Sequence, residues 1–278
     1  PLMAAELRGR VVAVTGGAGG IGRAIASRAA SRGARVAVGD LDPALAAEVP
    51  GAEAGLELDV TDVESFRGFL DRVEERLGPL DVLVNNAGIM FVGAFLEQDL
   101  AALRRQTDVN LHGVMIGTRL ALERMGPRDR GHVVNITSAG SYMPTPGEAM
   151  YSATKHAARA FTEAVRAELS GTAIQLTAVM PGLVRTELSA GTKAGRGTQW
   201  VEPDEVAEAV VAAMERPRPD VFVPRSIGPL LRFHNFLPLR GRQALARLFE
   251  VDKVAMGTDP SERAAYLARI GGGPGADG

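Results

Sequence analysis

Short apolar runs alternate along the chain with longer stretches whose apolar residues recur every three or four positions. The first pattern predicts strands and the second predicts amphipathic helices. The predicted strands cover residues 11–14, 35–38, 56–58, 82–84, 132–136, 174–180 and 221–223. The predicted helices cover residues 21–32, 62–77, 100–125, 149–169 and 203–214. This alternation is typical of a seven-stranded parallel sheet with helices on both faces, so we expect one doubly wound α/β domain.

The alternating pattern ends near residue 224 and divides the chain. We expect one nucleotide-binding and catalytic domain over residues 7–224, followed by a C-terminal extension over residues 225–270. The extension is rich in leucine and phenylalanine, and the segment 221–249 carries five arginines and no acidic residue. Such a segment can roof an apolar pocket, lie on an anionic membrane, or pack on its own domain or a partner subunit, and we favour packing. The glycine-rich residues 271–278 are expected to be disordered.

Composition narrows the classes of function. The chain has 278 residues and a net charge of −2, so it offers no cationic field for nucleic acid. It has no cysteine, which excludes disulfides and thiolate chemistry, and its four histidines show no metal-ligand spacing. We therefore expect no metal site. An apolar run of about 18 residues would be needed to span a membrane, and none occurs. The N-terminus lacks the pattern of a signal peptide, so we expect a cytoplasmic protein.

Ligands of doubly wound sheets bind beyond the carboxyl ends of the strands. The first predicted strand runs into Thr15-Gly-Gly-Ala-Gly-Gly-Ile-Gly22, and a helix follows. Glycines allow the backbone to approach a pyrophosphate, whose charge is favourable at a helix N-terminus. Gly17, Gly19 and Gly22 fit the G-x-G-x-x-G spacing, whereas Gly16, Gly20 and Gly22 fit a wider T-G-x-x-x-G-x-G spacing. Both registers predict a dinucleotide site.

Asp40 follows the second strand and bears on the choice of dinucleotide. A carboxylate there accepts hydrogen bonds from the adenosine ribose and repels a 2′-phosphate. The residue before Gly20 is Gly19, which offers no cation to such a phosphate. NAD is therefore favoured over NADP, with Arg23 in the first helical turn as the alternative phosphate partner.

Tyr151 and Lys155 are four residues apart in a predicted helix, so their side chains leave the same face. A lysine ammonium beside a phenol favours the phenolate and lowers the tyrosine pKa. Such a tyrosine can exchange a proton with an alcohol or carbonyl oxygen. Together with the glycine-rich loop, the pair predicts hydride chemistry.

Further motifs follow in the chain: Asp59-Val60, Asn85-Asn-Ala-Gly88, Asn110, Ser138 and Pro181-Gly-Leu-Val-Arg-Thr186. With the glycine-rich loop and the Tyr151/Lys155 pair, they make residues 9–223 resemble the short-chain dehydrogenase/reductase family. The resemblance implies a single Rossmann-type domain that binds NAD and forms a homotetramer or homodimer.

The resemblance also implies roles for individual residues. Tyr151 would exchange the proton, Ser138 would orient the substrate oxygen, Lys155 would hold the nicotinamide ribose, and Asn110 would anchor a water leading from Lys155 to solvent. Thr137 and Ser141 stay open as alternatives to Ser138. The residues implied to bind the cofactor are Gly16, Gly19, Gly20, Ile21, Gly22, Asp40, Leu41, Asp59, Val60, Asn86, Ala87, Gly88, Tyr151, Lys155, Pro181, Gly182, Val184 and Thr186.

Apolar loops are expected to form the substrate side of the site: 89–92, 139–144 and 183–184. They suit an apolar secondary alcohol or ketone, steroid- or lipid-like among others. Arg185 is the candidate partner for a substrate carboxylate, and residues 187–201 are expected to form a mobile surface loop beside the site. We therefore predict an NAD-dependent oxidoreductase. The alternatives are a dinucleotide sensor without turnover and an NADP-dependent carbonyl reductase.

Overall fold

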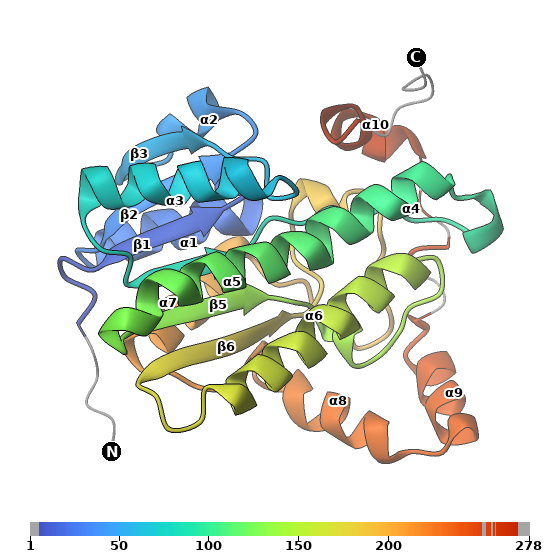
Figure 1. The fold of residues 1–278 in the computed structure, drawn as a ribbon. Coiled ribbons are helices and arrows are strands. Elements are labelled where there is room, and N and C mark those ends of the chain that lie inside the picture. The colour runs from blue at the N-terminus through green and yellow to red at the C-terminus, as the bar shows by residue number, and fades with distance from the viewer. Residues whose placement is uncertain (1–5, 252–253, 257, 259, 272–278) are drawn as a thin grey trace.

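The computed structural model describes residues 6–271 except 252–253, 257 and 259, and its centre is one parallel sheet. The strand order is β3-β2-β1-β4-β5-β6-β7, and every neighbouring pair is parallel (Figure 1). The strands are β1 (Val11–Thr15), β2 (Arg35–Asp40), β3 (Ala52–Glu57), β4 (Val82–Asn85), β5 (Gly131–Ile136), β6 (Ile174–Pro181) and β7 (Asp220–Val223). The predicted doubly wound fold is confirmed.

Helices cover both faces of this sheet. The α-helices of the described chain are α1 (Gly20–Ser31), α2 (Pro43–Ala47), α3 (Val63–Leu77), α4 (Leu100–Thr107), α5 (Gly113–Met125), α6 (Ala149–Glu168), α7 (Pro203–Glu215), α8 (Ile227–Phe236), α9 (Leu239–Leu248) and α10 (Pro260–Arg269). Helices α1 and α7 pack on one face, and α3 and α5 pack on the other, with α6 beside α5 (Figure 1). Within the described residues, no helix is both long and apolar enough to cross a membrane.

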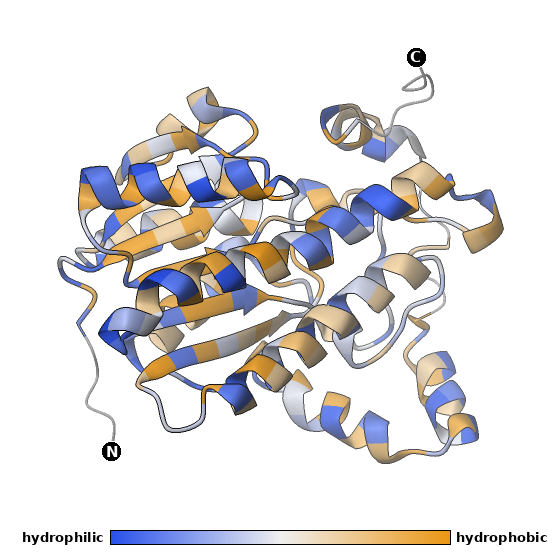
Figure 2. Cartoon of the chain, in the orientation of Figure 1, coloured by the Kyte–Doolittle hydropathy of each residue, from blue (hydrophilic) through white to orange (hydrophobic). Residues whose placement is uncertain are grey.

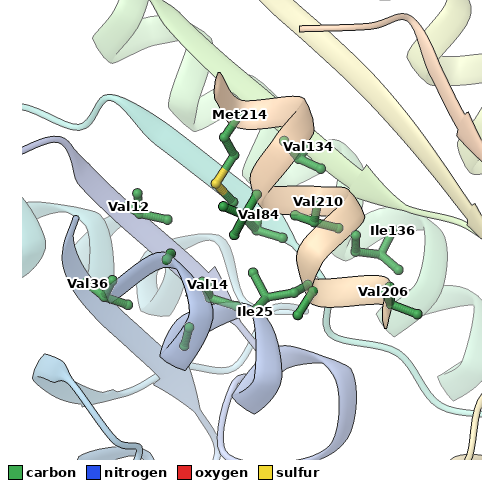
Figure 3. Close-up of a cluster of buried hydrophobic side chains, with 14 of the residues drawn as sticks. Val12, Val14, Ile25, Val36, Val84, Val134, Ile136, Val206, Val210 and Met214 are labelled. Carbon is green, nitrogen blue, oxygen red and sulfur yellow. The ribbon is translucent and has the colours of Figure 1, made fainter. Parts of the chain in front are cut away.

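Alternation along each strand explains why both faces are apolar. Val12 and Val14 of β1 point to the face that α1 and α7 cover, where they meet Ile25 and Val210 (Figure 3). Val11 and Ala13 point to the opposite face, beneath α3 and α5. Because successive strand residues face opposite sides, a strand buried on both sides reads as a continuous apolar run. This is the pattern from which the strands were predicted.

The predicted helix over residues 100–125 is helical throughout, but it is not α-helical along its whole length. A π-helical turn at Asp108–His112 separates α4 from α5. Asn110, in that turn, is fully buried, and its amide bonds the backbone of Ile89 in the loop after β4. Single π-turns inside helices often mark functional sites. Periodicity could not show this turn, because one extra residue barely disturbs the apolar pattern.

Other differences lie at the edges of the domain. Strand β3 begins at Ala52, ahead of the predicted start, because its pairing with β2 includes Ala and Gly positions of low strand propensity. The helices α2, α8, α9 and α10 were not predicted. Apart from Gly271, the tail expected to be disordered lies outside the described residues.

Candidate active site

A cavity of about 820 Å³ opens at the carboxyl ends of the strands. It lies where the strand order reverses, between β1 and β4, which is where doubly wound sheets bind ligands. All but two of the sequence-predicted site residues line it, the two exceptions being Gly22 and Asn110. The fold therefore gathers motifs that are spread over most of the chain.

The glycine-rich loop forms one wall of the cavity. Its glycines are required for two different physical reasons. Gly16 and Gly20 have φ angles of +60° and +51°, which side chains disfavour. A Cβ on Gly22 would lie 2.4 Å from the Gly16 carbonyl oxygen and 2.5 Å from Asn86 Nδ2. Gly22 thus permits close packing of α1 and does not line the cavity, so a contact between Gly22 and the cofactor stays a prediction. The positive φ angles at Gly16 and Gly20 favour the wider register.

Thr15 joins the ends of β1 and β4 across the switch point. Its hydroxyl oxygen accepts hydrogen bonds from the backbone amides of Asn86 and Ala87, at 3.0 and 3.1 Å. The Asn86 side-chain amide donates to the carbonyls of Thr15 and Gly16, at 3.0 and 2.9 Å. The Asn86 amide nitrogen is therefore committed to holding the loop. Sequence reasoning gave Thr15 no role, although it opens the glycine motif.

Asp40 lies at the far end of the same wall. One of its carboxylate oxygens accepts a hydrogen bond from the Ala18 amide at 3.0 Å, which fixes the side chain against the glycine-rich loop. Leu41 and Asp42 line the cavity beside it, whereas Arg23 does not. The Arg23 guanidinium donates to the Glu48 carbonyl at 3.2 Å. A carboxylate, with no guanidinium beside it among the described residues, thus lines this corner of the cavity.

The hydroxyl groups that follow β5 separate into distinct roles. Thr137 donates to the Val179 carbonyl at 2.8 Å, and Ser141 donates to the Ser138 carbonyl at 2.6 Å. Ser138 lines the cavity, and its oxygen accepts from the Gly140 amide at 3.0 Å, which leaves its own proton to donate. Of the three candidates, only the Ser138 hydroxyl is placed to act on a substrate.

Tyr151 and Lys155 leave one face of α6, as predicted, and both are buried at the cavity. Lys155 Nζ lies 5.7 Å from the centroid of the Tyr151 ring and donates to the Ile136 carbonyl at 3.1 Å. Burial lowers the Lys155 pKa to about 8. Burial, together with the Glu148 carboxyl, raises the Tyr151 pKa above its ordinary value, and a hydrogen bond with Ser138 opposes this. The expectation that Lys155 brings the Tyr151 pKa toward neutrality is wrong for this state of the protein.

Asn110 does not reach the cavity but supports its floor. Its side chain accepts from the Ile89 amide and donates to the Ile89 carbonyl, both at 2.8 Å. A Cβ on Gly88 would lie 3.3 Å from Asn110 Oδ1 and 3.4 Å from Lys155 Nζ. Asn110 and Lys155 therefore converge on Gly88, and a side chain there would crowd both.

The substrate side of the cavity is apolar, as expected, although not every predicted residue lines it. Ile89, Met90 and Met143 line the cavity, as do Leu183 and Val184. The residues of the predicted loops that do not line it are Phe91, Val92, Ser141, Tyr142 and Pro144, and Arg185 does not line it either.

The structure shows what three of these residues contact instead. Phe91 joins a small apolar cluster with Tyr266 and Ile270, and Tyr142 stacks on Phe222. Arg185 is exposed, pairs with Glu202 at 3.0 Å and covers Trp200. The expectation that Arg185 meets a substrate carboxylate is wrong.

The loop over residues 187–201 does border the cavity, but it is held in place. Ser189 and Thr192 in it are buried, and Val201 forms a bridge with Val184. Arg263 of α10 donates to the carbonyls of Leu188 and Ala190, at 3.0 and 2.8 Å. Residues 187–201 are therefore held by contacts with α10 and with Val184, and only part of this segment is a surface loop.

Helix α10 closes the cavity with residues that sequence reasoning missed. Buried Arg263 also donates to the Met90 carbonyl, and the Tyr266 hydroxyl accepts from the Met90 amide. Arg263 thus ties the loop after β4 to the loop after β6. Arg269 pairs with Glu187 at 2.6 Å, and its Nη1 lies 3.8 Å from the place a Cβ on Gly19 would take.

Glu148 was missed too, although its carboxyl lies among the reacting groups. It is 8% exposed, lines the cavity and acts electrostatically on Tyr151. Burial raises its pKa to about 7, and the Arg263 guanidinium opposes this. No motif includes Glu148, although it precedes Tyr151 by three residues, and α10 lies in the extension, outside the motif-bearing segment.

The sequence model of the short chain dehydrogenase family matches residues 10–197, so the chain belongs to that family. An uncharacterized oxidoreductase of Staphylococcus saprophyticus is 33% identical over 220 residues, which are 76% of this chain and 94% of that one. A 3-alpha-(or 20-beta)-hydroxysteroid dehydrogenase of Mycobacterium bovis is 35% identical over 217 residues, which are 77% of this chain and 80% of that one.

The fold agrees with solved structures of the same family. A short chain dehydrogenase/reductase from Burkholderia phymatum in complex with NAD superposes with a TM-score of 0.73, at 23% identity, over 92% of this chain and 98% of that one. The protein is therefore a Rossmann-type oxidoreductase of a family whose members act on CH–OH groups.

Proposed function

We propose that this protein is an NAD-dependent dehydrogenase/reductase that interconverts a secondary alcohol and a ketone, with Tyr151 as acid and base. One observation carries the proposal. Ser138, Tyr151 and Lys155 line the same cavity as the glycine-rich loop and Asp40, across the switch point of the sheet. A dinucleotide laid along that cavity would bring its reactive ring to the three polar side chains.

The residues present fit the cofactor. Gly16 and Gly20 turn the backbone toward the cavity at the N-terminus of α1, where an anion is favourable. Asp40 offers a carboxylate to ribose hydroxyls, which supports NAD over NADP. The similarity to a family member in complex with NAD supports the same choice. When bound, NAD would accept the hydride of an alcohol and NADH would return it to a ketone.

The side chains of the protein would contribute proton transfer and the positioning of substrate and cofactor. The Gly140 amide orients the Ser138 hydroxyl, which hydrogen-bonds Tyr151 in the free protein, so we expect it to turn its proton to the substrate oxygen when a substrate binds. Burial keeps the Tyr151 phenol protonated, so it can give its proton to a ketone oxygen as that oxygen gains charge. The Lys155 ammonium, held by the Ile136 carbonyl, lies where it can meet ribose hydroxyls and stabilise the phenolate left behind.

The lining favours an apolar substrate. Beyond the polar groups, the wall consists mainly of aliphatic side chains, with Met90, Met143 and Leu183 joined by Leu230 and Leu231. The similarity to a hydroxysteroid dehydrogenase supports a bulky, steroid- or lipid-like alcohol. A cytoplasmic location and a homodimer or homotetramer are part of this proposal and depend on the family resemblance.

Turnover of a ketone panel tests the proposal. NADH oxidation should occur with cyclic and steroid ketones, and NADPH should serve less well. Tyr151→Phe should lower kcat by about 10²–10⁴ with little change in NADH affinity. Tyr142→Phe is the matched control, because this buried tyrosine points away from the cavity onto Phe222. NADH binding without turnover of any ketone would favour a dinucleotide sensor instead.

A further inference from the structure

Helices α8 and α9 form a hairpin at one end of the molecule, outside the layers of the domain (Figure 1). Helix α8 is docked through the buried residues Gly228, Leu231 and His234. Helix α9 has ten residues, and none of them is buried. An isolated helix of that length is marginal in water, since most helices gain their stability from packing of an apolar face. Helix α9 contacts α8 but fully buries none of its own residues, so it gains little from packing within the described chain.

The hairpin exposes large apolar side chains. Phe233 and Phe236 of α8 are 57% and 87% exposed, and Leu239 and Leu248 of α9 are 70% and 58% exposed. Phe233 and Phe236 are three positions apart, so they share one side of α8. Apolar and charged residues alternate over both helices (Figure 2). Exposed aromatic residues gathered in this way mark an interaction surface.

The positive charge of the hairpin favours an anionic partner. Residues 221–249 contain five arginines and no acidic residue, in a chain whose net charge is −2. Arg232 faces Asp220 at 3.8 Å, and the Arg242 guanidinium donates to the Leu237 and Asn235 carbonyls at the bend. Arg225, Arg240 and Arg247 are exposed. The hairpin thus offers exposed phenylalanine and leucine together with exposed arginines.

We infer that the α8–α9 hairpin docks the protein on an anionic lipid bilayer. Phenylalanine and leucine would enter the boundary of headgroups and acyl chains, and arginines would meet lipid phosphates. A second copy of this chain suits the surface less well. A two-fold interface would place the same arginine-rich patch on both subunits and set like charges against each other.

Docking of the hairpin on a membrane would also affect how substrate reaches the cavity. This step rests on the proposed function. Leu230 and Leu231 of α8 line the cavity, as does Phe249 just after α9. A bilayer in contact with the hairpin would therefore lie beside the apolar side of the cavity. A membrane-dissolved alcohol or ketone could then reach the site with little exposure to water.

Vesicle flotation with the full chain tests docking without any need for turnover. The protein should float with vesicles of equal parts phosphatidylcholine and phosphatidylglycerol, but not with phosphatidylcholine alone, and added salt should weaken the binding. Phe233→Ser/Phe236→Ser and Arg240→Gln/Arg247→Gln should each lower the partition coefficient about tenfold or more. Phe95→Ser/Leu96→Ser is the matched control, because these residues are 57% and 95% exposed in the short helix at Phe95–Glu97.

Two results would overturn the inference. The first is a failure of the wild-type protein to float with anionic vesicles, or a loss of binding in the Phe95→Ser/Leu96→Ser control that is as large as in the hairpin variants. The other is a self-association in solution that Phe233→Ser/Phe236→Ser abolishes while binding to anionic vesicles persists. Size-exclusion chromatography of the same variants detects the second, which would assign the hairpin to a subunit interface. Loss of ketone turnover with intact vesicle binding would count against the proposed function alone.

Discussion

Replacing Glu148 with glutamine should stabilise the fold at alkaline pH and have a much smaller effect at acidic pH. The Glu148 pKa rises from 4.5 to about 7, first because the carboxyl is buried and despite the opposing Arg263 guanidinium. Between these two values the folded protein holds a proton that the unfolded chain has released. Stability therefore falls as pH rises through this window, and the loss is complete above pH 7.

The size of the effect follows from the same two pKa values. A shift of one pKa unit corresponds to about 1.36 kcal/mol. Ionisation of Glu148 therefore lowers the free energy of unfolding by about 1 kcal/mol at pH 5 and by about 3 kcal/mol at pH 8. Glutamine keeps the shape of the side chain and cannot ionise. The free energies of unfolding of Glu148→Gln and wild type should therefore diverge by about 2 kcal/mol between these two pH values.

Urea unfolding followed by fluorescence of Trp200, the one tryptophan of the chain, measures this difference. The m-values of the two proteins must agree for the comparison to hold. Glu163→Gln on the same helix is the matched control, because that side chain is 68% exposed and should give an offset that does not vary with pH. A Glu148→Gln offset that stays constant from pH 5 to 8, or a variant less stable than wild type at pH 8, would refute the reasoning.

Three further predictions concern the cofactor and the cavity wall. Asp40→Ala should weaken NAD binding by about 1.5–3 kcal/mol and narrow the gap to NADP; titration of both cofactors checks this, and a wild type that prefers NADP contradicts it. The Lys155 ammonium is present below its pKa of about 8, so NAD affinity measured calorimetrically should fall as pH rises through 8 in wild type but not in Lys155→Met. Arg263→Met removes three hydrogen bonds to the loops around the cavity. Chymotrypsin should therefore cleave the 260–271 segment faster, and KM should rise. Unchanged proteolysis would show that α10 docks without the Arg263 hydrogen bonds.

Much of the protein could be predicted from short stretches of sequence. Strands buried on both faces appear as continuous apolar runs, and amphipathic helices as a repeat of three to four residues, because these periods depend on local backbone geometry. The loop from Gly16 to Gly22 was recognisable because positive φ angles and close backbone approach restrict a position to glycine. Tyr151 and Lys155 were recognisable because their spacing matches one helical turn.

The same stretches could not reveal interactions between segments far apart in the chain. The π-turn at Asp108–His112 presents Asn110 to Ile89, and the Gly22 contact is with Asn86, so both depend on how α1, α5 and the loop after β4 pack. The pKa of Tyr151 is another example. Spacing placed a cation on its helix face, but burial and Glu148 determine the direction of the shift.

The C-terminal extension separates most clearly what the sequence determines from what the structure decides. Its arginines and phenylalanines were visible as a composition, but that composition allowed a roof, a membrane surface or a packed tail, and it favoured the packed tail only slightly. The structure divides these roles: α10 carries Arg263 and Tyr266 over the cavity, and α9 projects with no buried residue. Local periodicity fixes which face of a helix is apolar, but only the path of the chain decides what that face meets, because burial and partnership are properties of segments distant in sequence.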